Sequence, residues 1–304
     1  NKLKKKNLIL IPYLLLFIQP VFMASNLIVA RGGVDYVPPI SLAFWRWTIV
    51  FLILLIFNYR ALIIKRQIIR KEFNKLFFLG SMGCGVCGAF PFLAGQTTTI
   101  VNMGIIYTSS PIFIILISLV FFKEKFTSIK FIGLVLCLVG VLVIITKADI
   151  NLLLRLQFTQ GDLWMLGAAI GWALYSIYLF YWKSRLSVFE RFTLISLFGS
   201  MSLLPFYVIE EIYIKKTVFN NLFFVWTFFA AVSPGIIAFS LYTYTQKFLG
   251  ATTTGFTLYL FTVYGAFYGI VLFDESLKTY HYISTIMVFL GIYLVKKKFK
   301  NEKI

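Results

Sequence analysis

Charged residues are scarce in this chain of 304 residues. Asp, Glu, Lys and Arg together make up 13% of it, whereas a typical soluble domain is about 25% charged. Only 11 residues are acidic, and there is one histidine. The three cysteines all lie within apolar runs, which argues against a disulfide framework. So few charges cannot cover a water-soluble globule, because its surface would also be apolar.

The same scarcity argues against an enzyme. Hydrolysis and group transfer need a nucleophile with a base, or a set of metal ligands. The single histidine, His281, only opens an apolar segment, and neither an HExxH motif nor a P-loop is present. Cys84 and Cys87 have CxxC spacing, but a chain with one histidine is a poor candidate for a metal or redox site. We therefore expect no catalytic residues, no metal and no cofactor.

Apolar residues, by contrast, are abundant. They make up 60% of the chain, with 34 Phe and 17 Tyr, and the mean hydropathy is +0.88. A membrane crossing needs about 20 apolar residues, which span about 30 Å of hydrocarbon. Ten segments of this kind occur, at residues 8–30, 39–57, 76–95, 99–122, 129–146, 162–182, 192–209, 223–246, 252–273 and 280–295. The sequence therefore predicts an all-α membrane protein with ten transmembrane helices.

The basic residues indicate how these segments are oriented. The net charge is +18, and Lys and Arg lie in short runs between the apolar segments. This pattern is typical of membrane orientation and contact with anionic lipid, and it argues against a nucleic-acid partner. Most of these residues fall at the two termini and after the second, fourth and sixth segments, so both termini are expected to be cytoplasmic. The abundance of Lys, Phe and Ile suggests a bacterial protein, which places it in the inner membrane.

The beginning of the chain resembles a signal peptide. Three lysines at residues 4–6 precede an apolar run that starts at Leu8. However, the run continues past the usual length of a signal peptide, to Ala30. We therefore interpret it as a retained first helix.

The two halves of the chain have the same pattern of apolar runs and charged turns. Glu124 is followed after 151 residues by Glu275, and each lies near a lysine in a short charged turn between two apolar runs. Each glutamate is expected to have a structural role and to hold its turn. Five segments per half is an odd number, so the second half must enter the membrane in the opposite direction to the first. We expect two inverted five-helix repeats, residues 1–148 and 149–304, with a site between them.

Arg46 is the strongest single candidate for a residue of that site. It lies about seven residues, or roughly 10 Å, inside the second segment. A charge at mid-membrane costs at least about 2.5–3.5 kcal/mol and usually faces a cavity or a partner. Arg46 is therefore expected to contact an anion or carboxylate in the translocation path. A structural ion pair, or a side chain that reaches toward the outer face, is the alternative.

Other polar side chains also need partners in an apolar medium. Asn26 in the first segment and Gln96 after the third are candidate substrate contacts. The alternative for both is a hydrogen bond between helices. Pro91 and Pro111 interrupt apolar segments and are expected to kink their helices and to act as hinges of a gate.

Aromatic residues supply the remaining candidates. Trp172, Tyr175 and Tyr178 follow one another at a spacing of three inside the sixth segment, so they are expected to share one helix face. Such a face would stack on a flat or cationic substrate, although helix packing explains it equally well. Further candidates for the cavity wall are Trp45, Phe92, Tyr107 and Tyr242.

Several motifs occur in a recognisable order. They are Ser25-Asn26, Pro39 followed by Arg46, Tyr107-Thr108-Ser109-Ser110-Pro111, Gly133 with Gly140, Gly161-Asp162-Leu163-Trp164, Trp172-Ala173-Leu174-Tyr175-Ser176, Glu275 and Gly291. Together they resemble the drug/metabolite transporter superfamily, specifically its EamA-type members, over nearly the whole chain. The second half has Thr262-Val263-Tyr264 where the counterpart of Pro111 is expected. The hinge at Pro111 is thus not mirrored.

The resemblance implies a carrier of amino acids or related metabolites, often exported. The leading hypothesis is an inner-membrane carrier, exporting or exchanging its substrate by alternating access around a central cavity. The alternative is a flippase or multidrug-type exporter of amphipathic or lipid-like substrates. No carboxylate falls at mid-segment, so we expect exchange or uniport without proton coupling, while sodium held by backbone carbonyls stays open. The expected partners are a small-molecule substrate and membrane lipids, with a monomer or homodimer as the assembly.

The predicted topology can be tested with a fused reporter. A reporter placed after Lys303 should be active only in the cytoplasm, because ten crossings return the chain to the side on which it began. A periplasmic reporter signal would contradict the ten-helix topology.

Overall fold

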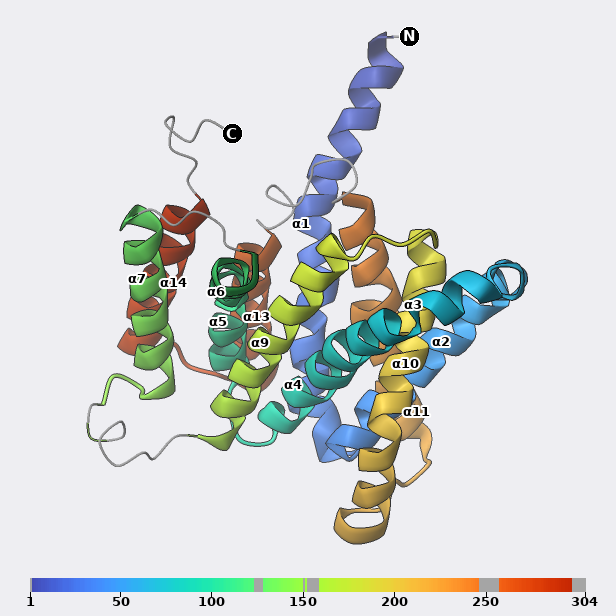
Figure 1. The fold of residues 1–304 in the computed structure, drawn as a ribbon. Helices are drawn as coiled ribbons and strands as arrows, with labels where there is room; N and C mark the ends of the chain where they lie inside the picture. Colours follow the sequence, from blue (N-terminus) through green and yellow to red (C-terminus); the bar gives the residue numbers. More distant parts are fainter. Residues whose placement is uncertain (1, 123–127, 150, 152–158, 246–256, 297–304) are drawn as a thin grey trace.

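The structure is a computed structural model that describes residues 2–122, 128–149, 151, 159–245 and 257–296 (Figure 1). These residues form helices and turns, without a β-strand. Six of the described helical segments have the length and apolar composition to cross a membrane, and shorter apolar helices cover Ile100–Ile114, Phe131–Ile145 and Leu260–Phe273. Together with α14 (Thr279–Lys296), they make ten apolar helical spans among the described residues, so the predicted all-α membrane fold of ten transmembrane helices is confirmed.

The first repeat contains five spans. In chain order they are α1 (Lys2–Gly32), α2 (Pro39–Ile64), α3 (Arg66–Gly80) continued by a π-helical turn (Ser81–Val86) and α4 (Cys87–Gly95), α5 (Ile100–Thr108) with α6 (Ser110–Phe122), and α7 (Ser128–Ile145).

The second repeat again contains five. They are α9 (Gln160–Tyr181), α10 (Val188–Ile209) with a π-helical end (Glu210–Ile214), α11 (Asn221–Ala231) continued by a π-helical turn (Val232–Ile237) and a helix over residues 238–245, α13 (Thr257–Phe273), and α14 (Thr279–Lys296).

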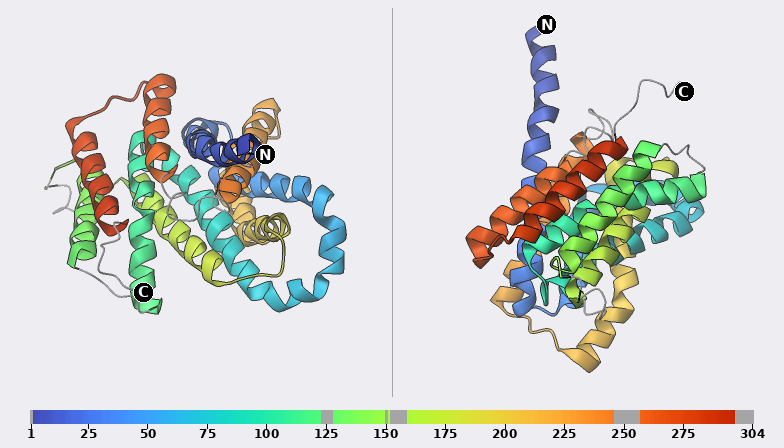
Figure 2. Two further views of the ribbon diagram at one scale, coloured as in Figure 1. Left: turned by 90° about the horizontal axis from the view of Figure 1, so that it is seen from above. Right: turned by 90° about the vertical axis from the view of Figure 1, so that its left-hand side faces the viewer.

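The two repeats are inverted relative to each other. In Figure 1, α1 runs downward and its counterpart α9 runs upward, while α1 begins and α14 ends at the top. The packing follows the same symmetry, because α1 packs against α13 in the way that α9 packs against α5 and α6. The equivalent helices α2 and α10 pack together, and α7 packs against α14. Figure 2 shows the α7–α14 pair at one edge of the molecule, with α2 and α3 at the other.

The π-helical turns repeat as well. Ser81–Val86 interrupts the third span, and Val232–Ile237 interrupts the eighth, 151 residues later. The first turn contains Gly83 and Gly85, and the second contains Pro234 and Gly235, residue types that weaken or break regular helix. Because π-helical turns occur most often at functional sites, their placement at equivalent points indicates a shared role in both repeats.

The predicted end of the second apolar segment, at Phe57, and the predicted start of the third, at Leu76, were wrong. The basic stretch after the second apolar segment was expected to be a loop, but α2 continues to Ile64 and α3 begins at Arg66, with only Lys65 between them. This stretch contains no Gly or Pro, and Lys, Arg and Glu are good helix formers. The fourth apolar segment is divided into α5 and α6 at Ser109, because Pro111 has no N–H to continue the helix.

Two glutamates of the second repeat bind helix starts of the first. Glu210 accepts from the backbone N–H groups of Ile40 (3.1 Å) and Ser41 (2.6 Å) at the start of α2. Glu275 accepts from those of Ile100 (2.8 Å) and Val101 (3.1 Å) at the start of α5. A carboxylate here satisfies free N–H groups and opposes the positive end of the helix dipole. The carboxylates therefore join the repeats at the lower end in Figure 1.

This finding changes one expectation. Glu124 and Glu275 were expected to hold the turns in which they lie, each beside a lysine. Glu275 has a structural role, but it stabilises a helix of the other repeat. Glu124 lies outside the described residues.

The cap at the start of α5 predicts a stability loss. Glu275→Ala leaves two N–H groups of α5 without their acceptor, which should cost about 1–2 kcal/mol and lower the melting temperature of the detergent-purified protein by several degrees. Asp35→Ala, which removes an exposed carboxylate, is the matched control. Equal melting of the two variants would contradict the proposed cap.

Candidate functional site

A small cavity of about 40 Å³ lies where the repeats meet. The first repeat contributes side chains from α1, α2, α4 and α5, and the second contributes them from α9, α13 and the turn after α11. Four of the predicted substrate contacts line it: Asn26, Arg46, Tyr107 and Trp172. Pro91, one of the two predicted hinges, lines it as well. Residues far apart in the sequence thus converge on one point.

Arg46 is the only charged side chain that lines this cavity among the described residues, and only 3% of it is exposed. Its Nη1 donates to Oδ1 of Asn26 (2.6 Å). Its guanidinium carbon lies 4.5 Å from the ring centre of Trp47, within the range of cation–π attraction. Nε of Arg46 is buried and has no acceptor among the described residues. The guanidinium therefore has one neutral acceptor and an unused donor.

No carboxylate among the described residues lies within 4.0 Å of Arg46. Their one ion pair is Lys65 with Glu190 (2.7 Å), where α2 ends and α10 begins. A buried charge without a counter-charge is costly. Within the described part of the chain, neither the structural ion pair nor exposure to an outer surface accounts for Arg46.

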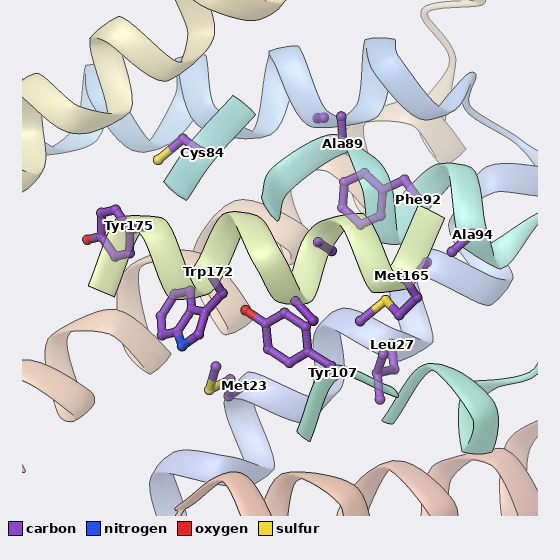
Figure 3. Close-up of a cluster of buried hydrophobic side chains, with 14 of the residues drawn as sticks. Met23, Leu27, Cys84, Ala89, Phe92, Ala94, Tyr107, Met165, Trp172 and Tyr175 are labelled. Atoms are coloured by element: carbon purple, nitrogen blue, oxygen red, sulfur yellow. The ribbon is translucent and has the colours of Figure 1, made fainter. Parts of the chain in front are cut away.

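Aromatic rings form one wall of the central cavity. The ring of Trp172 lies 6.1 Å from Tyr107 of α5 and 6.1 Å from Phe239. Figure 3 shows Tyr107 and Trp172 on the same side of α9, with Met23 of α1 beside them. The wall is therefore built by both repeats.

A larger cavity of about 550 Å³ adjoins the central one, and the two share the side chains of Trp172 and Phe239. Its described lining comes from α9, α10, their connection and residues 239–243. Two further predicted contacts, Tyr175 and Tyr242, lie in its wall. Lys183 lies at the α9–α10 connection, which is at the same end of the molecule as the start of α1 in Figure 1.

Arg191 also lines the larger cavity, and the sequence pattern did not single it out. The sequence predicts Arg191 in the basic loop between the sixth and seventh apolar segments. In the structure α10 begins at Val188 and includes Arg191. Its Nη1 and Nη2 donate to the carbonyls of Leu179 (3.2 Å) and Trp182 (2.6 Å) at the end of α9, while Nε is buried without an acceptor. Arg191 thus caps α9 and adds positive charge to the cavity wall.

The other predicted contacts lie away from both cavities. Trp45 packs against Phe219 and Phe223, with ring centres 5.8 and 6.3 Å away. Phe92 is buried behind Arg46, with its ring centre 5.7 Å from the guanidinium carbon. Gln96 is exposed at the end of α4.

Tyr178 packs against Phe78 and Trp182 and is not part of the cavity lining. Its position follows from helix geometry, because each residue advances about 100° around the axis. A spacing of three therefore drifts by about 60° per step, and Tyr178 lies about 120° away from Trp172. The expectation that three aromatic residues line one surface applies to Trp172 and Tyr175 but not to Tyr178.

A third cavity of about 260 Å³ lies at the opposite end of the molecule and shares no lining residue with the central one. Behind it, Oδ1 of the fully buried Asp162 accepts from Thr98 and from Asn102 (3.3 Å). Nδ1 of His281 accepts from the backbone of Lys278 (2.8 Å), so its Nε2 carries the proton and donates to Asn102 (3.1 Å). This network joins α5, α9 and α14 and holds this end together.

The comparisons with known proteins agree with this architecture. A family model described as "EamA-like transporter family" matches residues 10–146 and again 159–296. A Bacillus subtilis protein named "Uncharacterized transporter YyaM" is 29% identical over 168 residues, which cover 54% of this chain and about half (54%) of that relative. An "Uncharacterized transporter" of Archaeoglobus fulgidus is 23% identical over 94% of this chain and 97% of its own. One solved crystal structure has the same fold, with a TM-score of 0.59 at 15% identity, over 92% of this chain and 94% of that one.

The cavity arrangement predicts one-sided access. In a variant whose Cys84, Cys87 and Cys137 are replaced by alanine, Ser240→Cys in the larger cavity should react with a membrane-impermeant maleimide only from the side of the termini. Thr97→Cys, which lies in the third cavity, should react only from the other side. Labelling in right-side-out and inside-out vesicles measures both, and reaction of both cysteines from one side would contradict the arrangement.

Proposed function

This chain belongs to the EamA-like transporter family, and on that premise we propose that it carries a small metabolite across the membrane by alternating access around the central cavity. The observation that carries this proposal is Arg46, which is 3% exposed and lines a cavity at the contact between the repeats. Inverted repeats allow two states of similar energy that open to opposite sides of one fixed site. The substrate class is amino acids or related compounds, as the resemblance in the sequence implies.

Export or exchange fits the location of the larger cavity. This cavity extends from the α9–α10 connection to Trp172 and Phe239, whose side chains also line the central cavity. If the termini lie in the cytoplasm of the bacterial inner membrane, substrate enters from the cytoplasm. The third cavity lies beyond the buried network of Asp162, Asn102 and His281, which closes the other side in this state.

The proposed movement has hinges in both repeats. The π-helical turns at Ser81–Val86 and Val232–Ile237 lie in equivalent spans beside the cavity, and Gly83 and Pro234 of these turns line it. Pro91 lies one turn beyond the first. Pro111 follows the break between α5 and α6, where Ser110 donates to the carbonyl of Tyr107. Since residue 262 is a threonine, this last hinge acts in the first repeat alone.

A second candidate function is a flippase or multidrug-type exporter of amphipathic substrates. The observation in its favour is the apolar mouth of the larger cavity, where Phe180, Val188 and Phe189 are 66%, 49% and 51% exposed. The buried charge of Arg46 favours the metabolite carrier, since a lipid flippase needs a polar groove for the headgroup along its path. The two functions differ in whether fluorescent phospholipid or a soluble metabolite crosses the membrane.

A ligand screen tests the metabolite carrier. The full-length protein in detergent is tested by thermal shift against amino acids, polyamines, nucleosides, organic acids and quaternary amines, because a ligand that binds the native state raises its melting temperature. A hit should disappear in Arg46→Gln and persist in Arg60→Gln, which changes an exposed arginine of the same helix. It should also exchange across proteoliposome membranes.

Arg46→Gln should lower that exchange at least tenfold, as expected for removal of a buried charge that pairs with the substrate. Arg46→Lys should retain part of it, because lysine keeps the charge but loses the planar fork. Scrambling of fluorescent phospholipid without exchange of any soluble hit would contradict the metabolite carrier and support the flippase.

A further inference from the structure

The central and larger cavities, taken together, carry charge of one sign. Arg46, Lys183 and Arg191 line them, and no Asp or Glu does so among the described residues. Walls of one sign attract counter-ions and repel ions of the same sign, most strongly where water is scarce. We propose that the transported substrate is an organic monoanion with an apolar body and without an ammonium group. This inference rests on the proposed transport function and narrows its substrate class.

The anionic group of the substrate binds at Arg46. Within the described part of the chain, its guanidinium has only the neutral carbonyl of Asn26 as hydrogen-bond acceptor, and Nε is left without one. A carboxylate or sulfonate supplies both the missing counter-charge and an acceptor for Nε. Arginine suits this role, because its planar fork matches the two oxygens of such a group.

An ammonium group finds no counter-charge at the same site. The α-ammonium of an amino acid brings three donors and a positive charge within a few ångströms of its own carboxylate. At that distance the guanidinium repels it, and the acceptor of Asn26 already serves Arg46. The aromatic faces attract cations, but Arg46 lies over Trp47 and near Phe92. Deaminated relatives of amino acids therefore fit better than amino acids themselves.

The side chains that line the two cavities near Arg46 are mostly aromatic, so they favour a substrate with an apolar body. Trp172 and Phe239 separate the small cavity from the large one, and Tyr175 lies 5.4 Å from Trp172, ring centre to ring centre. A cavity of about 550 Å³ is in the range that holds a small organic molecule. The body of the substrate therefore extends from Arg46 past Trp172 toward the α9–α10 connection.

The path to Arg46 is positive as well. Arg191 is fixed by two carbonyls at the end of α9, and its Nε has no acceptor among the described residues. Lys183 lines the same cavity at the α9–α10 connection. Glu72 accepts from Ser184 (2.5 Å) at this connection but does not line the cavity. Arg191 and Lys183 both raise the local concentration of anions at the entrance. Arg191 thus guides the substrate, whereas Arg46 binds it.

Matched ligands that differ only in charge test the inference. The first set is 3-phenylpropionate, phenylalanine and phenethylamine, and the second is 4-methylpentanoate, leucine and isopentylamine. Binding to the full-length protein in detergent is measured by calorimetry at pH 7.5. The carboxylate of each set should bind at least tenfold more tightly than the zwitterion and the amine. Arg46→Gln should remove this preference, and Arg60→Gln should keep it.

Transport is measured with 2-phenylethanesulfonate, because a sulfonate stays ionised and does not cross lipid by itself. Proteoliposomes should exchange it faster than protein-free liposomes. If the zwitterion or the amine of either set binds more tightly than the carboxylate, or is exchanged in its place, the anion inference is overturned and the carrier function stands. If no compound of any charge binds or exchanges, both fail. The comparison of ligands uses the unmodified protein, so it holds even where an Arg46 variant does not fold.

Discussion

Arg46 carries a buried positive charge that has no negative partner among the described residues, and the proposed functional site follows from this charge. The guanidinium of Arg46 is buried, donates to one amide and lies over one indole ring. These neutral contacts recover part of its hydration but leave Nε unsatisfied. A charged side chain inside a membrane span is costly and usually marks a substrate or ion pathway. In the proposed site, the amide of Asn26 orients the guanidinium and the ring of Trp47 stacks on it. Trp172 forms part of the cavity wall.

Arg46 lies between the inverted repeats, beside the helix turns that are proposed as hinges. The π-helical turns interrupt equivalent spans, and Gly83 of the first and Pro234 of the second touch the central cavity. At the end away from the termini, Glu210 and Glu275 of the second repeat cap helices of the first, and Asp162, Asn102 and His281 join three spans. At the other end, the 550 Å³ cavity stays open beside Arg191. The contacts that join the repeats thus lie on one side of Arg46, and the larger cavity lies on the other.

The sequence predicted the parts of the fold that depend on hydrophobic length. Ten apolar runs, an odd number per half and a repeat of 151 residues were enough for the inverted ten-helix architecture. Helix ends were less predictable: the stretch around Lys65 is helical because charged residues without Gly or Pro continue a helix as easily as they end it. The partner of Glu275 was missed because a contact with Ile100, 175 residues away, leaves no local pattern.

The sequence indicated some residues of the candidate site and missed or misplaced others. Arg46 and Asn26 are conspicuous as polar residues in apolar runs, and they form a hydrogen bond. Gln96 is equally polar, but it lies beyond the end of α4 and is exposed. Tyr178 followed the spacing of Trp172 and Tyr175, yet the 3.6-residue turn of the helix carries it away from the cavity. Arg191 was expected in a loop, because it follows other basic residues. In the structure it lies in the first turn of α10 and lines the larger cavity.

One measurement tests the role of Arg46 most directly. It is a crystal structure of the full-length protein with bound 3-(4-bromophenyl)propionate, with the bromine located by its anomalous signal. The carboxylate should lie within hydrogen-bond distance of the Arg46 guanidinium, and the bromine should lie beside Trp172 and Phe239. A ligand found only in the third cavity, or one that leaves Nε of Arg46 without an acceptor, would contradict Arg46 as the substrate-binding charge.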